Sequence, residues 1–279
     1  MLGSALVSTL RPDIEVTALA RDTIGDLTLP VMAGRIDQFL DILGIDDGVT
    51  VVNALGVVKG RIDESESESV LRALSINTVF ARKLASYCAM QGARVITVLT
   101  DCVYSGQTGS YSEQAKHDAT DVYGKTKSLG EVSGGLSTNI RASFLGTSLA
   151  KHRMLFDWFR ELPNGSTVDG YTTHLWNSTT TVSLSRVIRS LVFEQPDLYG
   201  TFHLVPGYAL SKYELLMKLR LATSREDVQV VPTEPDKVDR TLSTIHPSVS
   251  EQLWRASDGD VPDSIDYALE ELFAKVLNV

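Results

Sequence analysis

Two side chains near the middle of the chain have the types and the spacing needed to move a proton. Tyr123 and Lys127 stand four residues apart, so on a helix they lie on the same face. A free tyrosine has a pKa of about 10 and exchanges protons poorly at neutral pH. Because a neighbouring ammonium favours the phenolate, we expect Lys127 to lower the pKa of Tyr123. Such a pair can pass a proton to or from an oxygen on a carbon that undergoes hydride transfer.

A hydroxyl group is predicted close to this pair. Thr100 follows the apolar run at 94–99, which reads as a strand, and leads into the segment 101–106. Ligands of open α/β sheets bind at the carboxyl ends of the strands. We therefore expect Thr100 to hydrogen-bond the reacting carbonyl; the alternative is that its side chain only caps its own turn.

The elements that must position these groups alternate along the first 150 residues. Short apolar, β-branched runs predict strands at 15–19, 51–54, 94–99 and 139–143, and helices are expected near 36–44, 67–90 and 121–133. Continuous apolar runs suit parallel strands that are covered on both faces. The sequence thus predicts an α/β fold, a doubly wound parallel sheet of the Rossmann type.

The later part of the chain has a different pattern. Residues 162–181 are rich in Gly, Ser, Thr and Asn and are expected to form a long loop. Ser211 and Glu214 have the spacing of a capping box at a helix start. An apolar stripe then predicts an amphipathic last helix, with Ile265, Ala268, Leu269, Leu272, Phe273, Val276 and Leu277 on one face.

These patterns suggest two portions of unequal size. We expect residues 1–148 to form the larger domain, with 178–206 packed on it. Residues 149–177 and 207–279 are expected to form a smaller, mostly helical portion that binds substrate.

Composition excludes several classes of protein. The chain has 279 residues, with 26 Lys and Arg against 35 Asp and Glu, a net charge of −9. It therefore lacks the basic surface of a nucleic-acid binder. No apolar run reaches the roughly 18 residues that a membrane helix needs, and no signal peptide is recognisable. The two cysteines match no metal-ligand spacing and the five histidines are not clustered, so we expect no metal site and a cytoplasmic protein.

Several further segments show which family the chain resembles. They are Val52-Asn53-Ala54-Leu55-Gly56, the segments 99–106 and 123–131 around the residues above, and 170–171, 175–177 and 239–243 in the C-terminal half. Together they resemble the extended short-chain dehydrogenase/reductase superfamily and, within it, the dTDP-4-dehydrorhamnose reductase (RmlD-like) family. The resemblance covers nearly the whole chain. It implies an NADPH-dependent reductase of a nucleotide-activated 4-keto-6-deoxy sugar, in the synthesis of cell-surface polysaccharide precursors.

The same resemblance implies a catalytic triad of Thr100, Tyr123 and Lys127. Tyr123 would protonate the C4 oxygen of the sugar as hydride arrives from a nicotinamide. Lys127 would lower the pKa of Tyr123 and hold the nicotinamide ribose, and Thr100 would orient the carbonyl.

The predicted cofactor site is incomplete at the N-terminus. Members of the superfamily have a first strand and a three-glycine turn, whose backbone N–H groups meet the pyrophosphate at a helix start. Only the last of these glycines has a counterpart here, Gly3. We expect the chain to be shorter than a working enzyme by about ten residues, and to bind dinucleotide poorly as written.

Other residues are predicted to contact the cofactor. Arg21 suits the extra phosphate of NADPH, whereas the neighbouring Asp22 leaves NADH as an alternative. Asn53, Ala54 and Gly56 would approach the cofactor through the backbone. Met32 stands where many relatives have an aspartate that contacts the adenine.

Four residues are predicted to contact the nucleotide-sugar substrate. Trp176 would stack on the sugar or base, Asn177 would hydrogen-bond it, and Arg240 would pair with the diphosphate through its forked guanidinium. Asp101 would contact the sugar or cap its turn. By analogy with the superfamily, the chain is expected to form a homodimer.

Two other functions are compatible with these residues. One is a nucleotide-sugar epimerase or dehydratase on the same fold, although Asp101-Cys102 lacks the Asp-Glu pair typical of a dehydratase. The other is a non-catalytic, NADP-binding regulatory protein. The intact Tyr123 and Lys127 argue against it, and the absent glycine turn argues for it.

Overall fold

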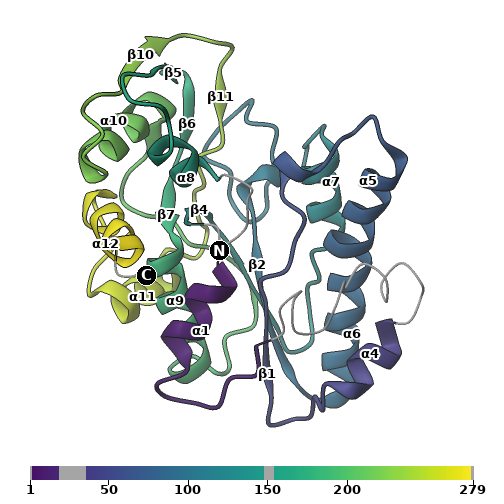
Figure 1. The fold of residues 1–279 in the computed structure, drawn as a ribbon. Coiled ribbons are helices and arrows are strands. Elements are labelled where there is room, and N and C mark those ends of the chain that lie inside the picture. Colours follow the sequence, from purple (N-terminus) through teal and green to yellow (C-terminus); the bar gives the residue numbers. More distant parts are fainter. Residues whose placement is uncertain (1, 19–35, 148–153, 278–279) are drawn as a thin grey trace.

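The computed structural model describes residues 2–18, 36–147 and 154–277, and these residues form both helices and parallel strands (Figure 1). The first half contains α1 (Leu2–Leu10), α4 (Ile36–Ile42), β1 (Thr50–Asn53), η1 (Lys59–Arg61), α5 (Ser67–Ala73), the π-helix η2 (Leu74–Phe80), α6 (Ala81–Gln91), β2 (Arg94–Leu99), η3 (Asp101–Val103), α7 (Val122–Leu129) and β3 (Ser137–Arg141). The second half contains β4 (Ser143–Leu145), α8 (Leu155–Arg160), β5 (Thr167–Tyr171), β6 (His174–Trp176), β7 (Ser178–Thr180), α9 (Thr181–Phe193), β8 (Gly200–His203), β9 (Leu210–Ser211), α10 (Lys212–Ala222), β10 (Gln229–Thr233), β11 (Val238–Asp239), α11 (Pro247–Asp258) and α12 (Asp266–Leu277). None of these described helices is long and apolar enough to cross a membrane.

Four parallel strands form the central sheet, in the order β1-β2-β3-β8. Val51 of β1 lies opposite Val95 of β2, and Ile140 of β3 lies opposite Phe202 of β8. Helices α1 and α9 cover one face of the sheet, and α4 and α6 cover the other (Figure 1). The predicted doubly wound parallel sheet of the Rossmann type is confirmed, and so are the strands predicted at 51–54 and 94–99.

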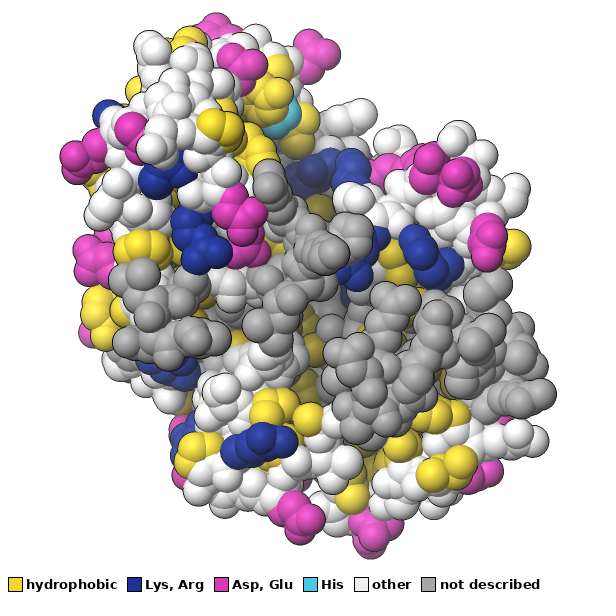
Figure 2. Space-filling model, viewed as in Figure 1, with side chains coloured by type: hydrophobic (Ala, Val, Ile, Leu, Met, Phe, Trp, Pro, Cys, Tyr) yellow, Lys and Arg dark blue, Asp and Glu magenta, His cyan; other side chains and the backbone are white. Residues whose placement is uncertain are grey.

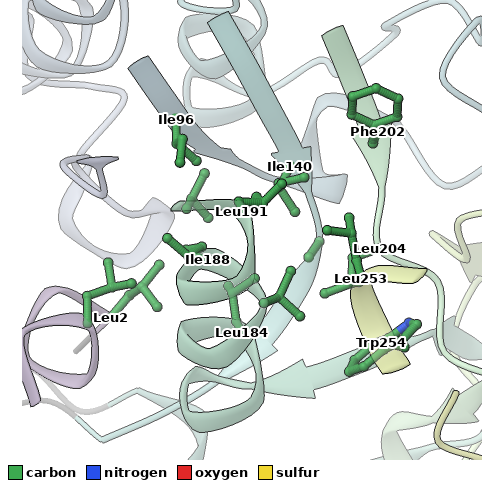
Figure 3. Close-up of a cluster of buried hydrophobic side chains, with 14 of the residues drawn as sticks. Leu2, Ile96, Ile140, Leu184, Ile188, Leu191, Phe202, Leu204, Leu253 and Trp254 are labelled. Atoms are coloured by element: carbon green, nitrogen blue, oxygen red, sulfur yellow. The ribbon is translucent and has the colours of Figure 1, made fainter. Parts of the chain in front are cut away.

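Successive residues of β2 point to opposite faces of the sheet and fix its position. Ile96 packs with Leu2 of α1 and Ile188 of α9 in the core shown in Figure 3. Val95 points the other way, into a cluster that includes Leu40 of α4 and Leu84 of α6. Full burial of such a side chain stabilises the fold by about 1.5–3 kcal/mol. A slip of the strand by one residue would exchange the two faces, so this pattern holds the carboxyl end of β2 in place.

The C-terminal part has a core of its own. Leu215 of α10 and Leu269 and Leu272 of α12 are buried together in it. Ser211 and Glu214 form the predicted capping box, in which each side chain bonds the other residue's backbone N–H. The predicted apolar stripe of the last helix is also confirmed at these buried positions.

One expectation about this region is wrong. Residues 162–181 are not one long loop, because they contain the short strands β5, β6 and β7. Their partners are β10, β11 with β9, and β4, respectively. The second half of the chain accordingly contains several short strands beside its helices. Local composition cannot reveal such pairing, since most of the partners lie far away in the sequence.

The N-terminal third also differs from the prediction. Residues 15–18 form no regular element, so the strand expected at 15–19 is wrong there, and Leu19 lies outside the described residues. A strand needs a neighbour for its backbone hydrogen bonds, and the described residues offer none at this point. The helix predicted at 67–90 exists, but its middle turns, η2, have π geometry. Such widened turns are frequent at functional sites.

Candidate active site

Thr100 lies where the sequence predicts, at the carboxyl end of β2. Its hydroxyl accepts a hydrogen bond from the Cys102 backbone N–H at 3.2 Å and donates one to Asp101 Oδ1 at 3.2 Å. The first bond caps the short helix η3. Thr100 therefore plays the turn-capping role that the sequence left as an alternative, while its side chain remains at the edge of the sheet where a ligand would bind.

Helix α7 brings Tyr123 to Thr100 because residue 124 is glycine. The helix starts at the N-cap Asp121, whose side chain accepts from the Gly124 N–H at 2.8 Å. A Cβ on Gly124 would lie 2.3 Å from the Cys102 carbonyl oxygen and 2.4 Å from the Ala119 Cβ. Both distances are far below van der Waals contact, so no larger residue allows α7 to approach the Thr100 turn this closely.

The phenol of Tyr123 is held in its protonated form. Burial raises the pKa of Tyr123 above its usual value, and Cys102 and Asp101 act in the same direction, whereas the hydrogen bond to Thr100 lowers it. The expectation that this pKa lies below the usual value is wrong for this structure, because burial is the largest influence on Tyr123 and raises its pKa. A protonated phenol is what a reduction requires of its proton donor.

Lys127 faces the turn that follows β1. Burial lowers the pKa of Lys127 and the Glu131 carboxylate raises it. A Cβ on Gly56 would lie 3.7 Å from Lys127 Nζ and 3.4 Å from Asn77 Oδ1. The structure thus brings the predicted cofactor residue Gly56 next to the predicted catalytic lysine.

Asn77 connects these elements and was missed by the sequence reasoning. Its Oδ1 accepts from the Val57 N–H at 2.8 Å, and its Nδ2 donates to the Val57 carbonyl at 3.0 Å and to Thr126 Oγ1 at 3.1 Å. The Gly130 backbone also packs on it, since a Cβ there would lie 1.9 Å from the Asn77 carbonyl oxygen. Asn77 lies in the π-helix η2, whose sequence Leu-Ser-Ile-Asn-Thr-Val-Phe has no pattern that singles it out.

Asp101 accepts a hydrogen bond from Thr100 and lies within electrostatic range of two cations. Burial raises the pKa of Asp101, whereas the nearby Arg240 and Lys212 lower it. The predicted diphosphate ligand Arg240 is already partly engaged, because its Nε donates to the Tyr104 carbonyl at 2.9 Å and its Nη2 donates to the Ser105 carbonyl at 3.3 Å. Arg240 thereby holds the 100–106 turn in place.

Lys and Arg side chains gather around the middle of this face of the molecule, whereas most Asp and Glu side chains lie nearer its outline (Figure 2). The positive charge is thus local, on a chain whose net charge is −9. A local concentration of positive charge favours an anionic ligand.

Trp176 lines a small cavity of about 170 Å³ with Lys212, which the sequence reasoning also missed. Lys212 Nζ lies 3.3 Å from the centroid of the Trp176 ring. The other lining residues are Phe144, Leu145, Gly146, Met154 and Leu155. A wider hollow of about 510 Å³ lies along residues 60–72 and contains none of the predicted site residues.

The remaining predicted residues divide into three groups. Asn53 is buried, and its side chain caps the turn after β1 by accepting from the Leu55 N–H at 3.2 Å. Ala54 is exposed beside it, and Gly3 is exposed in the first turn of α1. Arg21, Asp22 and Met32 lie outside the described residues.

Asn177 has a structural role in the fold. Both ends of its side-chain amide bond Leu242: Oδ1 accepts from the backbone N–H at 2.9 Å, and Nδ2 donates to the carbonyl at 2.7 Å. Asn177 is buried, and its predicted contact with the substrate stays a prediction.

Two histidines that are distant in the sequence meet at a buried arginine. Arg141 contacts His203 Nε2, His117 Nε2 at 3.1 Å and Glu131 Oε2 at 2.6 Å. The sequence shows no clustering of these side chains because only the parallel pairing of β3 with β8 puts Arg141 and His203 side by side. Within the described residues, no group of three or more His, Cys, Asp or Glu side chains is arranged to hold a metal ion.

A parallel, doubly wound sheet with a Thr, Tyr and Lys constellation at its edge defines an NAD(P)-dependent oxidoreductase of the short-chain dehydrogenase/reductase type. The family model described as the RmlD substrate binding domain matches residues 1–277. The chain belongs to this family, a reductase family of the extended short-chain dehydrogenase/reductase superfamily.

Named relatives agree with this assignment. The chain is 25% identical over 253 residues to a dTDP-4-keto-6-deoxy-D-glucose reductase of Streptomyces niveus, and the match covers 85% of this chain and 81% of that one. It resembles the crystal structure of a dTDP-4-dehydrorhamnose reductase of Clostridium acetobutylicum with a TM-score of 0.77 and 21% identity, over 100% of this chain and 96% of that one. The same enzyme of Bacillus anthracis, solved in complex with NADP, gives a TM-score of 0.77 at 19% identity, over 98% and 95% of the two chains. At this identity the two structures support the fold.

Proposed function

We propose that this protein uses NADPH to reduce the 4-keto group of a nucleotide-activated 6-deoxy sugar, as a step in the synthesis of cell-surface polysaccharide precursors. One observation carries the proposal: the close approach at Gly124 puts the Tyr123 phenol against Thr100 at the carboxyl end of β2. The family and the activity of the Streptomyces niveus relative support the substrate class. The relative solved with NADP supports the cofactor.

The turn after β1 fits a dinucleotide. Ala54 and Gly56 are exposed, and glycine at position 56 leaves room between the backbone and the Lys127 ammonium. Lys127 would hold the nicotinamide ribose, and Gly3 at the start of α1 would face the phosphates. Arg21 would hold the extra phosphate of NADPH. The bound nicotinamide supplies the hydride.

In the proposed reaction, Tyr123 donates a hydrogen bond to the C4 carbonyl oxygen, and Thr100 donates a second one once its hydroxyl proton turns from Asp101 Oδ1 toward the substrate. Tyr123 gives its proton to that oxygen as the carbon accepts hydride, and a phenolate remains. The raised pKa of Tyr123 keeps the proton on the phenol until then. The Lys127 ammonium stabilises the phenolate that forms.

The two portions of the chain would bind different ligands. We assign dinucleotide binding to residues 1–148 together with 178–206, and nucleotide-sugar binding to 149–177 and 207–279. The cores support this division in part. β8 at 200–203 joins the central sheet and α10 and α12 pack in a separate cluster, whereas Leu253 and Trp254 of α11 pack in the core of the sheet. Trp176 and Asp101 then lie at the junction between the portions.

Replacing Tyr123 with Phe tests the proposal. The variant removes only the hydroxyl that gives the proton, so NADPH oxidation in the presence of dTDP-4-keto-6-deoxyglucose should fall by roughly 10²- to 10⁴-fold. Binding of NADPH, measured by fluorescence titration, should stay within about twofold. A Tyr123→Phe enzyme with full activity contradicts the assignment of the proton donor, and wild-type protein that binds NADPH without oxidising it supports a regulatory role instead.

We further propose that the protein acts in the cytoplasm as a homodimer. Both cysteines, Cys88 and Cys102, are free, which is usual in a reducing compartment. Exposed Leu71, Val79 and Leu129 lie on the neighbouring elements α5, η2 and α7, where a second copy could cover them. Sedimentation analysis distinguishes a dimer from a monomer.

A further inference from the structure

We propose that Lys212, seated on the face of Trp176, forms the subsite for the diphosphate of the nucleotide-sugar substrate. The inference rests on the proposed function and assigns a role to a residue outside the predicted Thr100, Tyr123 and Lys127 constellation. It replaces Arg240, which the sequence predicted for this contact.

The position of Lys212 is set by the local sequence. It is the first residue of α10, directly after the N-cap Ser211, and the capping box with Glu214 fixes that helix start. Its ammonium then lies 3.3 Å from the centroid of the Trp176 ring. A cation over an aromatic face is stabilised, and still more so where water is excluded. The lysine is therefore held in one place.

The ammonium has no hydrogen-bond or ion-pair partner among the described residues. Among the described residues, no acceptor hydrogen-bonds Lys212 Nζ and no carboxylate forms a direct ion pair with it, although Asp101 lies near enough to act on its charge. Burial lowers the pKa of Lys212 to about 8, while Asp101 and Cys102 raise it and Arg240 lowers it. An ammonium in such surroundings costs free energy until an anion compensates it.

The cavity beside the ammonium is suited to part of a ligand. At about 170 Å³ it is smaller than the roughly 300–1,000 Å³ of pockets that hold a whole drug-sized molecule. Lys212 is its only charged lining residue in the described structure; the rest of the lining is apolar except for glycine. A site with one cation and no carboxylate in its wall takes an anionic group.

The diphosphate is the anionic group that the proposed substrate brings to this place. Lys212 lies within electrostatic range of Asp101 and Cys102, which follow Thr100 directly, so the cavity adjoins the site of reduction. The diphosphate is joined to the sugar ring that must reach Thr100 and Tyr123. Arg240 is less available, because two of its guanidinium nitrogens bond the Tyr104 and Ser105 carbonyls.

The test compares Lys212→Met with Lys218→Met by calorimetric titration. Lys218 lies on the same helix but pairs with Asp266 on an exposed surface, so it serves as the matched control. The probes are dTDP, which carries the diphosphate without a sugar, and thymidine, which carries neither. Loss of a charge-assisted hydrogen bond should weaken dTDP binding roughly 10- to 100-fold in Lys212→Met only, and leave thymidine and NADPH binding unchanged.

The dependence of dTDP affinity on pH distinguishes a binding role of Lys212 from a purely structural one. In the wild type, dTDP affinity should fall as the pH rises past about 8, since Lys212 then loses its proton. Asp101 and Cys102 raise the pKa of Lys212, and Arg240 lowers it. These three groups are unchanged in every variant, so a difference between variants comes from residue 212. Lys212→Arg should restore binding and remove this pH dependence, because arginine stays charged.

Other results overturn the subsite. Unchanged dTDP binding in Lys212→Met excludes it, even if binding of the nucleotide sugar is lost, since the lysine would then contact the sugar. An equal loss of thymidine binding would indicate a collapsed cavity instead. A failure of the proposed function would look different. The wild-type protein would then bind dTDP through Lys212 but would not reduce the keto sugar.

Discussion

Gly124→Ala is the sharpest test of how this site is assembled. The added methyl would lie 2.3 Å from the Cys102 carbonyl oxygen and 2.4 Å from the Ala119 Cβ. Comfortable separations between such atoms are about 3.5 Å, so α7 must retreat from the Thr100 turn by about 1 Å. Both obstacles are close to the backbone and cannot rotate away.

The expected cost can be worked out from that displacement. A misplacement of about 1 Å between reacting groups lowers rates by roughly 100-fold, which corresponds to about 2.7 kcal/mol in the activation free energy. Overpacking should also destabilise the fold by about 1–3 kcal/mol. We therefore expect kcat/KM for the keto sugar to fall by about two orders of magnitude in a protein that still folds.

The assay is NADPH oxidation, with urea denaturation to follow stability. Gly60→Ala is the matched control, because a Cβ at Gly60 has no atom within 4 Å. It should leave both the rate and the free energy of unfolding near the wild-type values. Wild-type kcat/KM in a folded Gly124→Ala enzyme would refute the view that this contact sets the distance between Tyr123 and Thr100.

Two further predictions concern the surroundings of the site. Asn77→Leu leaves the buried Val57 N–H and carbonyl without their side-chain partner. The free energy of unfolding, measured in urea, should therefore fall by about 3 kcal/mol. An unchanged urea midpoint would show that these hydrogen bonds contribute nothing to stability. Burial, together with Arg141, lowers the pKa of His203 to about 4. The unfolded chain then takes up a proton more readily than the folded one, so stability should be complete above pH about 6.5 and decline by about 3 kcal/mol as the pH falls to about 4. His203→Gln should flatten this decline, and an equally steep decline in that variant would contradict the assignment.

Much of the architecture could be predicted from local patterns. The apolar runs of β1 and β2, the Ser211 capping box and the apolar stripe of α12 each depend on neighbouring residues, so periodicity and cap chemistry were enough to find them. The strands within 162–181 could not be predicted this way. Their existence depends on pairing with segments such as β10, about sixty residues further along.

The chemistry of the site shows the same limit. The spacing of Tyr123 and Lys127 indicated that they share a helical face, but not how deeply the phenol is buried. Burial, which raises the pKa of Tyr123, is set by the packing of α7 on η3. The positions of Asn77 and Lys212 likewise depend on tertiary contacts. So does the approach of His117 and His203 to Arg141.

The amino-acid sequence by itself determined the family, the parallel α/β architecture and the type of chemistry, because these depend on residue types at short, regular spacings. Only the tertiary structure decided which side chains meet: that Gly124 brings Tyr123 to Thr100, that Asn177 clamps Leu242, and that Lys212 lies on Trp176. These contacts join residues up to 65 positions apart. The physical reason is that burial and close approach are properties of the packed chain, and no local pattern encodes them.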